Sequence, residues 1–159
     1  EGSAAFAGGC AMSDEHLVLR VVVKVLFAPI LLFALYVQFH GELGAGGGFQ
    51  AGVIFAVAFI LAALILGLEE TKRVMPERAL LILMVVGVLF YAGTCFATML
   101  LGGNLLGYDA IDPQSTHHAG QHYGIMLVEF GVGMAVSSTM LMIFYHFAGR
   151  EPEIRDEDW

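Results

Sequence analysis

Four long apolar runs constrain what this chain can fold into more than any other feature of its sequence. They cover residues 18–39, 50–68, 79–101 and 123–148. A helix needs about 20 apolar residues to cross the hydrocarbon layer of a bilayer. A helix of that length in a soluble protein would carry a polar stripe, which these runs mostly lack. We therefore predict an all-α membrane protein with four transmembrane helices.

The composition supports a single membrane domain. Hydrophobic residues make up 58% of the 159 positions and the mean hydropathy is +0.77, so a water-soluble surface cannot be assembled. The runs follow one another without a Pro/Ser-rich linker, which predicts one domain over residues 18–149. A tail of residues 1–17 precedes it and an acidic tail of residues 150–159 follows. Within the first tail we expect residues 1–11 to be an extension, because Met12 begins a segment that reads like a translation start.

The basic residues predict how the helices are oriented, because cytoplasmic segments collect Lys and Arg. The connections 40–49 and 102–122 contain no basic residue. All seven basic residues lie at the opposite ends of the runs: Arg20, Lys24, Lys72, Arg73, Arg78, Arg150 and Arg155. We therefore expect a multi-pass protein of the cell (inner) membrane with both termini cytoplasmic. The net charge of -8, concentrated at the two ends of the chain, argues against nucleic acid as a partner.

Glu129 is the only acidic residue within a predicted span. Placing a charge there costs about 3 kcal/mol, so such a residue usually faces protein, water or a partner charge. Helical spacing puts His122, Gly133 and Ser137 on the same face, which predicts an inward orientation. Two interpretations remain open: a carboxylate that lines an ion pathway, or a protonated, hydrogen-bonded group with a structural role.

Three other polar residues within the runs are candidates for the same pathway, as is His122 just before the fourth run, and each of the three has a structural alternative. Lys24 lies one turn from Arg20, so both can snorkel to the headgroups, although Pro29 could admit water and allow a proton relay. Thr94 and Thr98 share one face of the third run. Their hydroxyls can bond to the preceding turn, which favours a packing seam over a hydrated path.

Small residues at four-residue spacing begin the second run. Gly48, Gly52 and Ala56 form this ladder, which favours close packing of a neighbouring helix over ligand binding. Gly133 and Ser137 predict the same kind of close approach in the fourth run.

Histidines and aspartates gather near the predicted outer side. They are His40, His117, His118 and His122, with Asp109 and Asp112. Such residues can bind zinc or haem, so a small haem- or metal-binding membrane protein is one alternative. Solvated loop histidines are favoured, because the pattern defines no third and fourth ligand. We predict no metal and no cofactor, and the lack of a Walker loop or dinucleotide fingerprint argues against a freestanding enzyme.

The glycine-rich segment between the first two runs resembles a family motif. His40 is followed by Gly46-Gly47-Gly48-Phe49, the likeness continues to Phe55, and it returns at residues 127–133 around Glu129. On these residues the chain resembles the MnhB/MrpB family of membrane subunits of the Mrp-type multisubunit Na+/H+ antiporter, over roughly residues 18–149. It departs from the family's common form at Gly41-Glu42 and at Ala45, where asparagine after the histidine and a proline are usual.

The resemblance implies a four-helix component of a large hetero-oligomeric membrane complex that exports Na+ in exchange for H+. Its partners would be the other subunits, membrane lipid, Na+ and H+, and no organic cofactor is implied. Larger subunits would carry the main proton channels, and Glu129 matches an acidic position of the family's fourth span. The alternative function is that of a structural scaffold subunit in a related complex I or hydrogenase-type membrane assembly.

Overall fold

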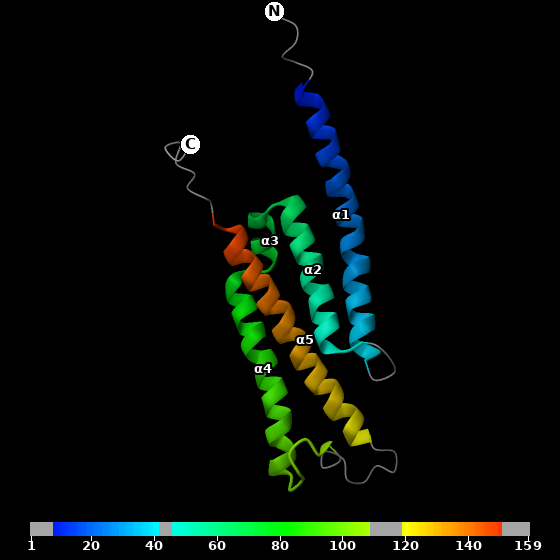
Figure 1. Cartoon of the computed structure of the whole chain (residues 1–159), viewed down its shortest axis with the longest axis vertical. Coiled ribbons are helices and arrows are strands. Elements are labelled where there is room, and N and C mark those ends of the chain that lie inside the picture. The colour runs from blue at the N-terminus through cyan, green and yellow to red at the C-terminus, as the bar shows by residue number, and fades with distance from the viewer. Residues whose placement is uncertain (1–7, 42–45, 109–118, 151–159) are drawn as a thin grey trace, which may run out of the picture.

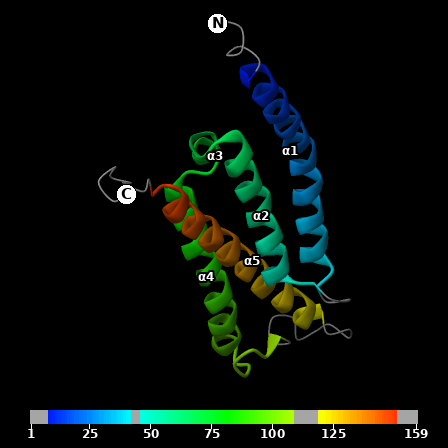
Figure 2. The same ribbon diagram turned by 45° about the horizontal axis from the view of Figure 1, so that its top comes forward.

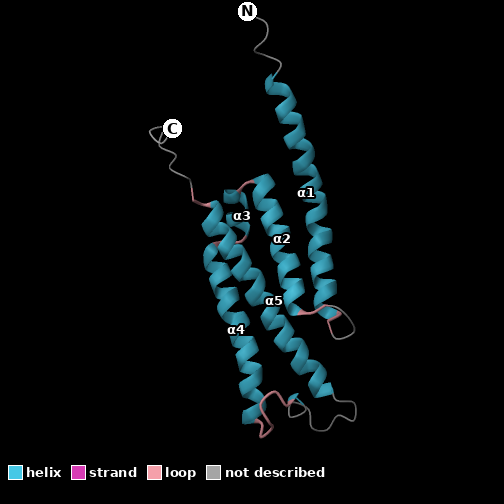
Figure 3. Cartoon of the chain, viewed as in Figure 1, coloured by secondary structure: helices cyan, strands magenta, loops and turns pink. Residues whose placement is uncertain are grey.

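The computed structural model describes residues 8–41, 46–108 and 119–150, which form helices and connecting turns without strands (Figure 3). The helices are α1 (Gly8–Phe39), α2 (Gly48–Leu66), α3 (Leu68–Val74), α4 (Glu77–Leu100) and α5 (Ala119–Ala148). Four segments are long and apolar enough to cross a membrane: Leu17–Phe39, Gly48–Leu66, Glu77–Leu100 and Gly120–Ala148. The predicted all-α architecture with four membrane-spanning helices is therefore confirmed.

The four long helices lie side by side in the order α1, α2, α5 and α4 (Figure 1). Helix α5 thus packs between α2 and α4, while α1 packs against the other side of α2. The first residues of α1 and the last residues of α5 lie at the same end of the molecule, together with α3 (Figures 1 and 2). The last residues of α1 and α4 and the first residues of α2 and α5 lie at the other end (Figure 1).

Two glycines explain how α5 can pack against a helix on each side. Gly131 and Gly133 are two residues apart, which separates them by about 200° around an α-helix. A Cβ built on Gly131 would lie 2.8 Å from the carbonyl oxygen of Gly87 on α4. A Cβ built on Gly133 would lie 3.2 Å from the carbonyl oxygen of Gly48 on α2. The absence of side chains on opposite faces of α5 therefore allows both neighbours to approach closely.

The short helix α3 was not predicted from the sequence, where the second apolar run continues to residue 68. Gly67 ends α2 with a φ of 112°, a conformation that favours glycine, and the chain turns there. Ion pairs join Lys72 to Glu77 at 3.1 Å and Arg73 to Glu70 at 3.4 Å in and beside α3. This polar helix lies near a cluster of buried residues, which consists of Ala56, Phe59, Leu80, Leu141 and Tyr145.

Much of the apolar surface of the spans is exposed. Leu32 on α1, Leu64 on α2 and Leu89 on α4 are each more than 60% exposed. Large apolar surfaces of this kind mark contact with lipid or with other chains. The layer of four helices therefore requires an apolar environment around it.

Candidate functional site

The structure brings the glycine segment and Glu129 together. A Cβ built on Gly41 would lie 2.8 Å from both carboxylate oxygens of Glu129, and one built on Gly47 would lie 3.1 Å from its Oε1. The carboxylate therefore occupies the space that side chains at these two positions would need. Glycine at Gly41 and Gly47 allows α5 to place its acidic side chain against the backbone of the α1–α2 connection.

The backbone of the connection is shaped by Gly47. Its φ of 114° lies in the region that favours glycine, and its N–H donates a hydrogen bond to the carbonyl of Val37 at 3.3 Å. Its own carbonyl accepts from the N–H of Ala51 at 3.0 Å, which starts α2. The positive end of α2 consequently lies beside the Glu129 carboxylate, where the helix dipole favours negative charge.

The ladder of small residues on α2 packs against α5. A Cβ built on Gly48 would overlap the backbone carbonyl of Glu129, and one built on Gly52 would lie 2.7 Å from the carbonyl oxygen of Gly133. Ala56, the third member, is fully buried. The close approach of α2 therefore holds the backbone of α5 in place at Glu129 itself and one turn later at Gly133. Phe49 points away from this contact and is 63% exposed.

The two described histidines of the predicted outer side contact residues of their own helices. The Nδ1 atom of His40 lies 3.0 Å from the carbonyl of Tyr36, and its ring stacks on the Tyr36 ring at 4.0 Å. The ring of His122 lies 5.8 Å from that of Tyr123. Among the residues that the structure describes, no three His, Cys, Asp or Glu side chains could hold a metal ion. The other members of the predicted group lie outside the described residues: Asp109, Asp112, His117 and His118.

The threonine hydroxyls on α4 that were considered for a pathway bond to their own helix, as does the hydroxyl of Ser137, which was predicted for helix packing on α5. Thr94 donates to the carbonyl of Phe90 at 2.7 Å, and Thr98 donates to that of Cys95 at 2.8 Å. Ser137 donates to the carbonyl of Met134 at 3.2 Å. Thr94, Thr98 and Ser137 are all buried. Their geometry is that of polar residues within helix contacts.

Lys24 is not part of the Glu129 site. It lies on α1, 17 residues before Gly41, which corresponds to roughly 25 Å at the helical rise. Its side chain is exposed and lines a separate pocket together with Glu70 and Thr71 near α3. The structure therefore places the basic and the acidic candidate of the predicted pathway at opposite ends of the layer.

Gln38 lies beside the candidate site and was not among the residues predicted from the sequence. The side chain is only 8% exposed, and its Oε1 atom lies 2.7 Å from the position of a Cβ on Gly133. Its Nε2 atom is buried without a hydrogen-bond partner among the described residues. The sequence could have indicated this residue, because Gln38 is the only amide side chain in the first apolar run.

Tyr108, which follows α4, is buried at the same end of the molecule as the Glu129 site. The Tyr108 ring packs against the backbone of Gly124, where a Cβ would overlap the ring. Burial, with smaller contributions from Cys95 and Tyr91, raises the pKa of the Tyr108 phenol above its ordinary value. The phenol is therefore neutral at physiological pH and adds no charge near the start of α5.

Four membrane-spanning helices define a multi-pass membrane protein, and Glu129 is a glycine-lined carboxylate within the last of these spans. Residues 18–142 match a family model described as a domain related to the MnhB subunit of Na+/H+ antiporter. The chain belongs to this MnhB domain family.

Individual relatives agree with the family match. The chain is 38% identical over 91 residues to proteins named "Putative antiporter subunit mnhB2" from Staphylococcus aureus strains Newman, JH1 and USA300. The match covers 57% of this chain and 64% of each relative. The chain therefore spans somewhat less than two thirds of the length of these curated relatives.

Proposed function

We propose that this chain is a membrane subunit of a multisubunit Na+/H+ antiporter that exports Na+ in exchange for H+. The observation that carries the proposal is the contact of the Glu129 carboxylate with the glycine connection in a chain of the MnhB domain family. The names of the Staphylococcus aureus relatives support the same assignment. The partners are then the other subunits of that complex, and the membrane is the cell membrane.

In the proposed mechanism Glu129 borders or lines the path of the exchanged ions. A carboxylate within a membrane needs either a proton or a cation beside it, so Na+ and H+ compete for the same group. The lack of side chains at Gly41 and Gly47 leaves room for the carboxylate, and α1 ends at Phe39 beside it. Carbonyls at the end of a membrane helix can coordinate Na+, which gives this connection a second role in cation binding.

The orientation of the proposed subunit follows from its basic residues. Lys72, Arg73 and Arg150 lie at the end of the layer that holds α3, the start of α1 and the end of α5, away from Gly47 (Figure 1). Because cytoplasmic segments carry an excess of positive charge, these residues support a cytoplasmic position for this end. The Glu129 site then lies toward the outer side of the membrane.

The experiment compares Glu129→Gln and Glu129→Ala in the complete complex, with Glu69→Gln as a matched control on the exposed face of α3. Complex yield and Na+ exchange driven by a pH gradient are measured in proteoliposomes. We expect Glu129→Gln to assemble normally and to lose exchange by roughly tenfold or more, since bonds to a charged group contribute about 1.5–3 kcal/mol. The Glu69→Gln complex should behave as wild type. Normal assembly with normal exchange in both Glu129 variants would refute the pathway role.

A scaffold role is the second candidate, and the glycine contacts on both faces of α5 favour it. In that case Glu129→Gln, which keeps hydrogen bonding, should exchange ions as wild type does. Glu129→Leu should then fail to assemble. This pattern would assign Glu129 to subunit assembly instead of transport.

A further inference from the structure

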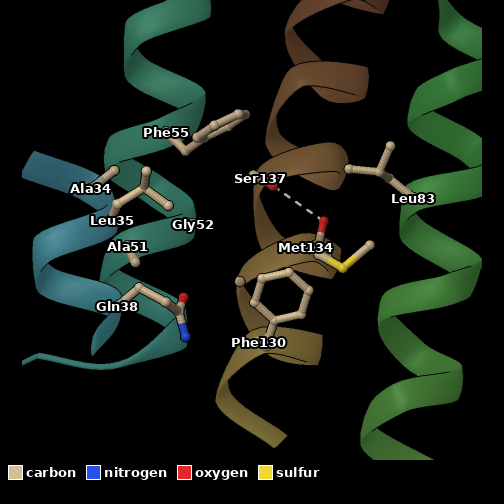
Figure 4. Close-up of a pocket in the computed structure, with 11 residues that line it drawn as sticks. Ala34, Leu35, Gln38, Ala51, Gly52, Phe55, Leu83, Phe130, Met134 and Ser137 are labelled. Atoms are coloured by element: carbon tan, nitrogen blue, oxygen red, sulfur yellow. Dashed lines mark hydrogen bonds between the residues drawn. The ribbon is translucent and has the colours of Figure 1, made fainter. Parts of the chain in front are cut away.

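One pocket of the molecule combines an apolar lining with a single unsatisfied donor. It has a volume of about 330 Å³ and is formed by all four membrane-spanning helices (Figure 4). Its lining includes Ala34, Leu35, Gln38, Phe55, Leu83 and Phe130. Leu35 and Phe130 are 48% and 45% exposed, so the pocket opens to the outside of the helix layer.

Gln38 supplies the polar feature of this pocket. Its side chain reaches from α1 toward α5, and its amide nitrogen is buried without a partner in the described part of the chain (Figure 4). A buried donor without a bond costs about 1–3 kcal/mol. The other polar side chain of the lining, Ser137, already donates to the carbonyl of Met134. The only open hydrogen-bonding demand of the described lining therefore comes from Gln38.

The position of Gln38 along its helix indicates how deep in the membrane its amide donor lies. It is the penultimate residue of the span Leu17–Phe39, so it lies at the boundary between hydrocarbon and headgroups. Ester carbonyls of phospholipids lie at this boundary, and their acyl chains extend from it toward the middle of the bilayer. From Gln38 the lining continues by one turn to Ala34 on α1 and by two turns of α5 from Phe130 to Ser137.

We propose that this pocket binds one acyl chain of a phospholipid and that Gln38 donates a hydrogen bond to the ester carbonyl of that chain. A partner helix satisfies the site less well, because its backbone groups bond internally and it would need a polar side chain at this depth. A helix is also about 10 Å wide with its side chains, whereas a chain of methylenes fits a narrow pocket between four helices. The proposal does not depend on ion exchange by the complex.

The test uses membranes that contain the complete complex and a phosphatidylglycerol probe with a photoreactive diazirine in its acyl chain. Labelling is competed with ester phosphatidylglycerol and with its ether analogue, which lacks the carbonyl. In wild type we expect labelled peptides from α1 and α5 around the pocket. The ester lipid should compete roughly two- to tenfold better than the ether lipid, as expected for one hydrogen bond.

Variants then assign this preference to Gln38. Gln38→Leu should remove the difference between ester and ether lipid, and Ala34→Leu should reduce labelling by filling the pocket. Gln50→Leu is the matched control, because Gln50 is exposed near the start of α2 and outside the pocket. Equal competition by the two lipids in wild type, or a preference that survives Gln38→Leu, would overturn the proposal. Labelling of partner peptides only would show that a partner subunit covers the pocket. That result would overturn the proposal as well.

Discussion

At the residue scale, Gly41 is the position where the smallest change should have a large effect. A methyl group there would lie 2.8 Å from both Glu129 carboxylate oxygens and 2.7 Å from the Cα of Gly47. We expect Gly41→Ala to destabilise this end of the molecule by about 1–3 kcal/mol, because the added atom overpacks a close contact. The yield of assembled complex in mild detergent, measured at increasing temperatures, should therefore be lower than that of wild type.

Gly93→Ala is the control for this prediction. Nothing lies within 4 Å of a Cβ at Gly93 on α4, so the same added methyl meets open space. Alanine also favours the helix over glycine by about 1 kcal/mol in a helix interior. The control should therefore assemble at least as well as wild type. Equal losses in the two variants would show that Gly41 has no special contact.

Glu129 could be found from the sequence, whereas its surroundings could not. A lone carboxylate in an apolar span is unusual enough to indicate a role. Its contact with Gly41 joins segments far apart in the chain, and helical periodicity carries no information about which helices are neighbours. Gln38 was overlooked because a neutral amide is less unusual in a membrane span, and only its burial without a partner among the described residues makes it notable.

At the scale of elements, α5 depends on glycines that face α4 and α2 in turn. Gly133→Leu should separate α2 from α5, because a Cβ there already lies 3.2 Å from the carbonyl oxygen of Gly48 on α2, besides 2.7 Å from the Gln38 amide oxygen on α1. We expect a loss of stability above about 3 kcal/mol, since the backbone contact leaves no room for a larger side chain. Thermal stability of the purified chain in detergent provides the measurement.

Gly93→Leu is the matched change on a helix surface that faces open space. This variant should keep a stability close to that of wild type in the same detergent. If Gly133→Leu were equally stable, the contact between α2 and α5 would not be close in solution.

The long helices were easier to predict from the sequence than the short one. Hydropathy identifies segments near 20 residues, and the four predicted spans agree with the helices within a few residues, α1 aside, because α1 begins at Gly8. The seven residues of α3 are too few for a periodic signal and include charges, which made the segment resemble a loop. The order of helices in the layer followed from glycine contacts that no local pattern reveals.

At the scale of the whole molecule, the proposed orientation predicts which end of the layer is reachable from outside. Asn104 and Arg150 are both exposed and lie at opposite ends of the chain's helices. With Cys10 and Cys95 replaced by serine, Asn104→Cys should react with a membrane-impermeant thiol reagent in right-side-out vesicles. Arg150→Cys should react only after the vesicles are opened, because its end carries the positive charges.

The reverse labelling pattern would place the termini outside and contradict the orientation. Equal labelling of both positions before opening would indicate leaky vesicles, which a cytoplasmic marker protein controls. Either way the result leaves the packing of the helices unchanged, because the orientation rests on charge and the packing rests on glycine contacts.

The contact between the glycine connection and Glu129 is the central claim, and a cross-link between the two positions tests it most directly. Gly41→Cys and Glu129→Cys, combined in a chain without its natural cysteines, are oxidised or treated with a short thiol cross-linker in membranes. We expect a link between positions 41 and 129 within one chain, identified by mass spectrometry of the joined peptides. Gly41→Cys with Gly93→Cys should not link. Absence of the first link, although both thiols react with a small maleimide, would show that the two segments are not in contact.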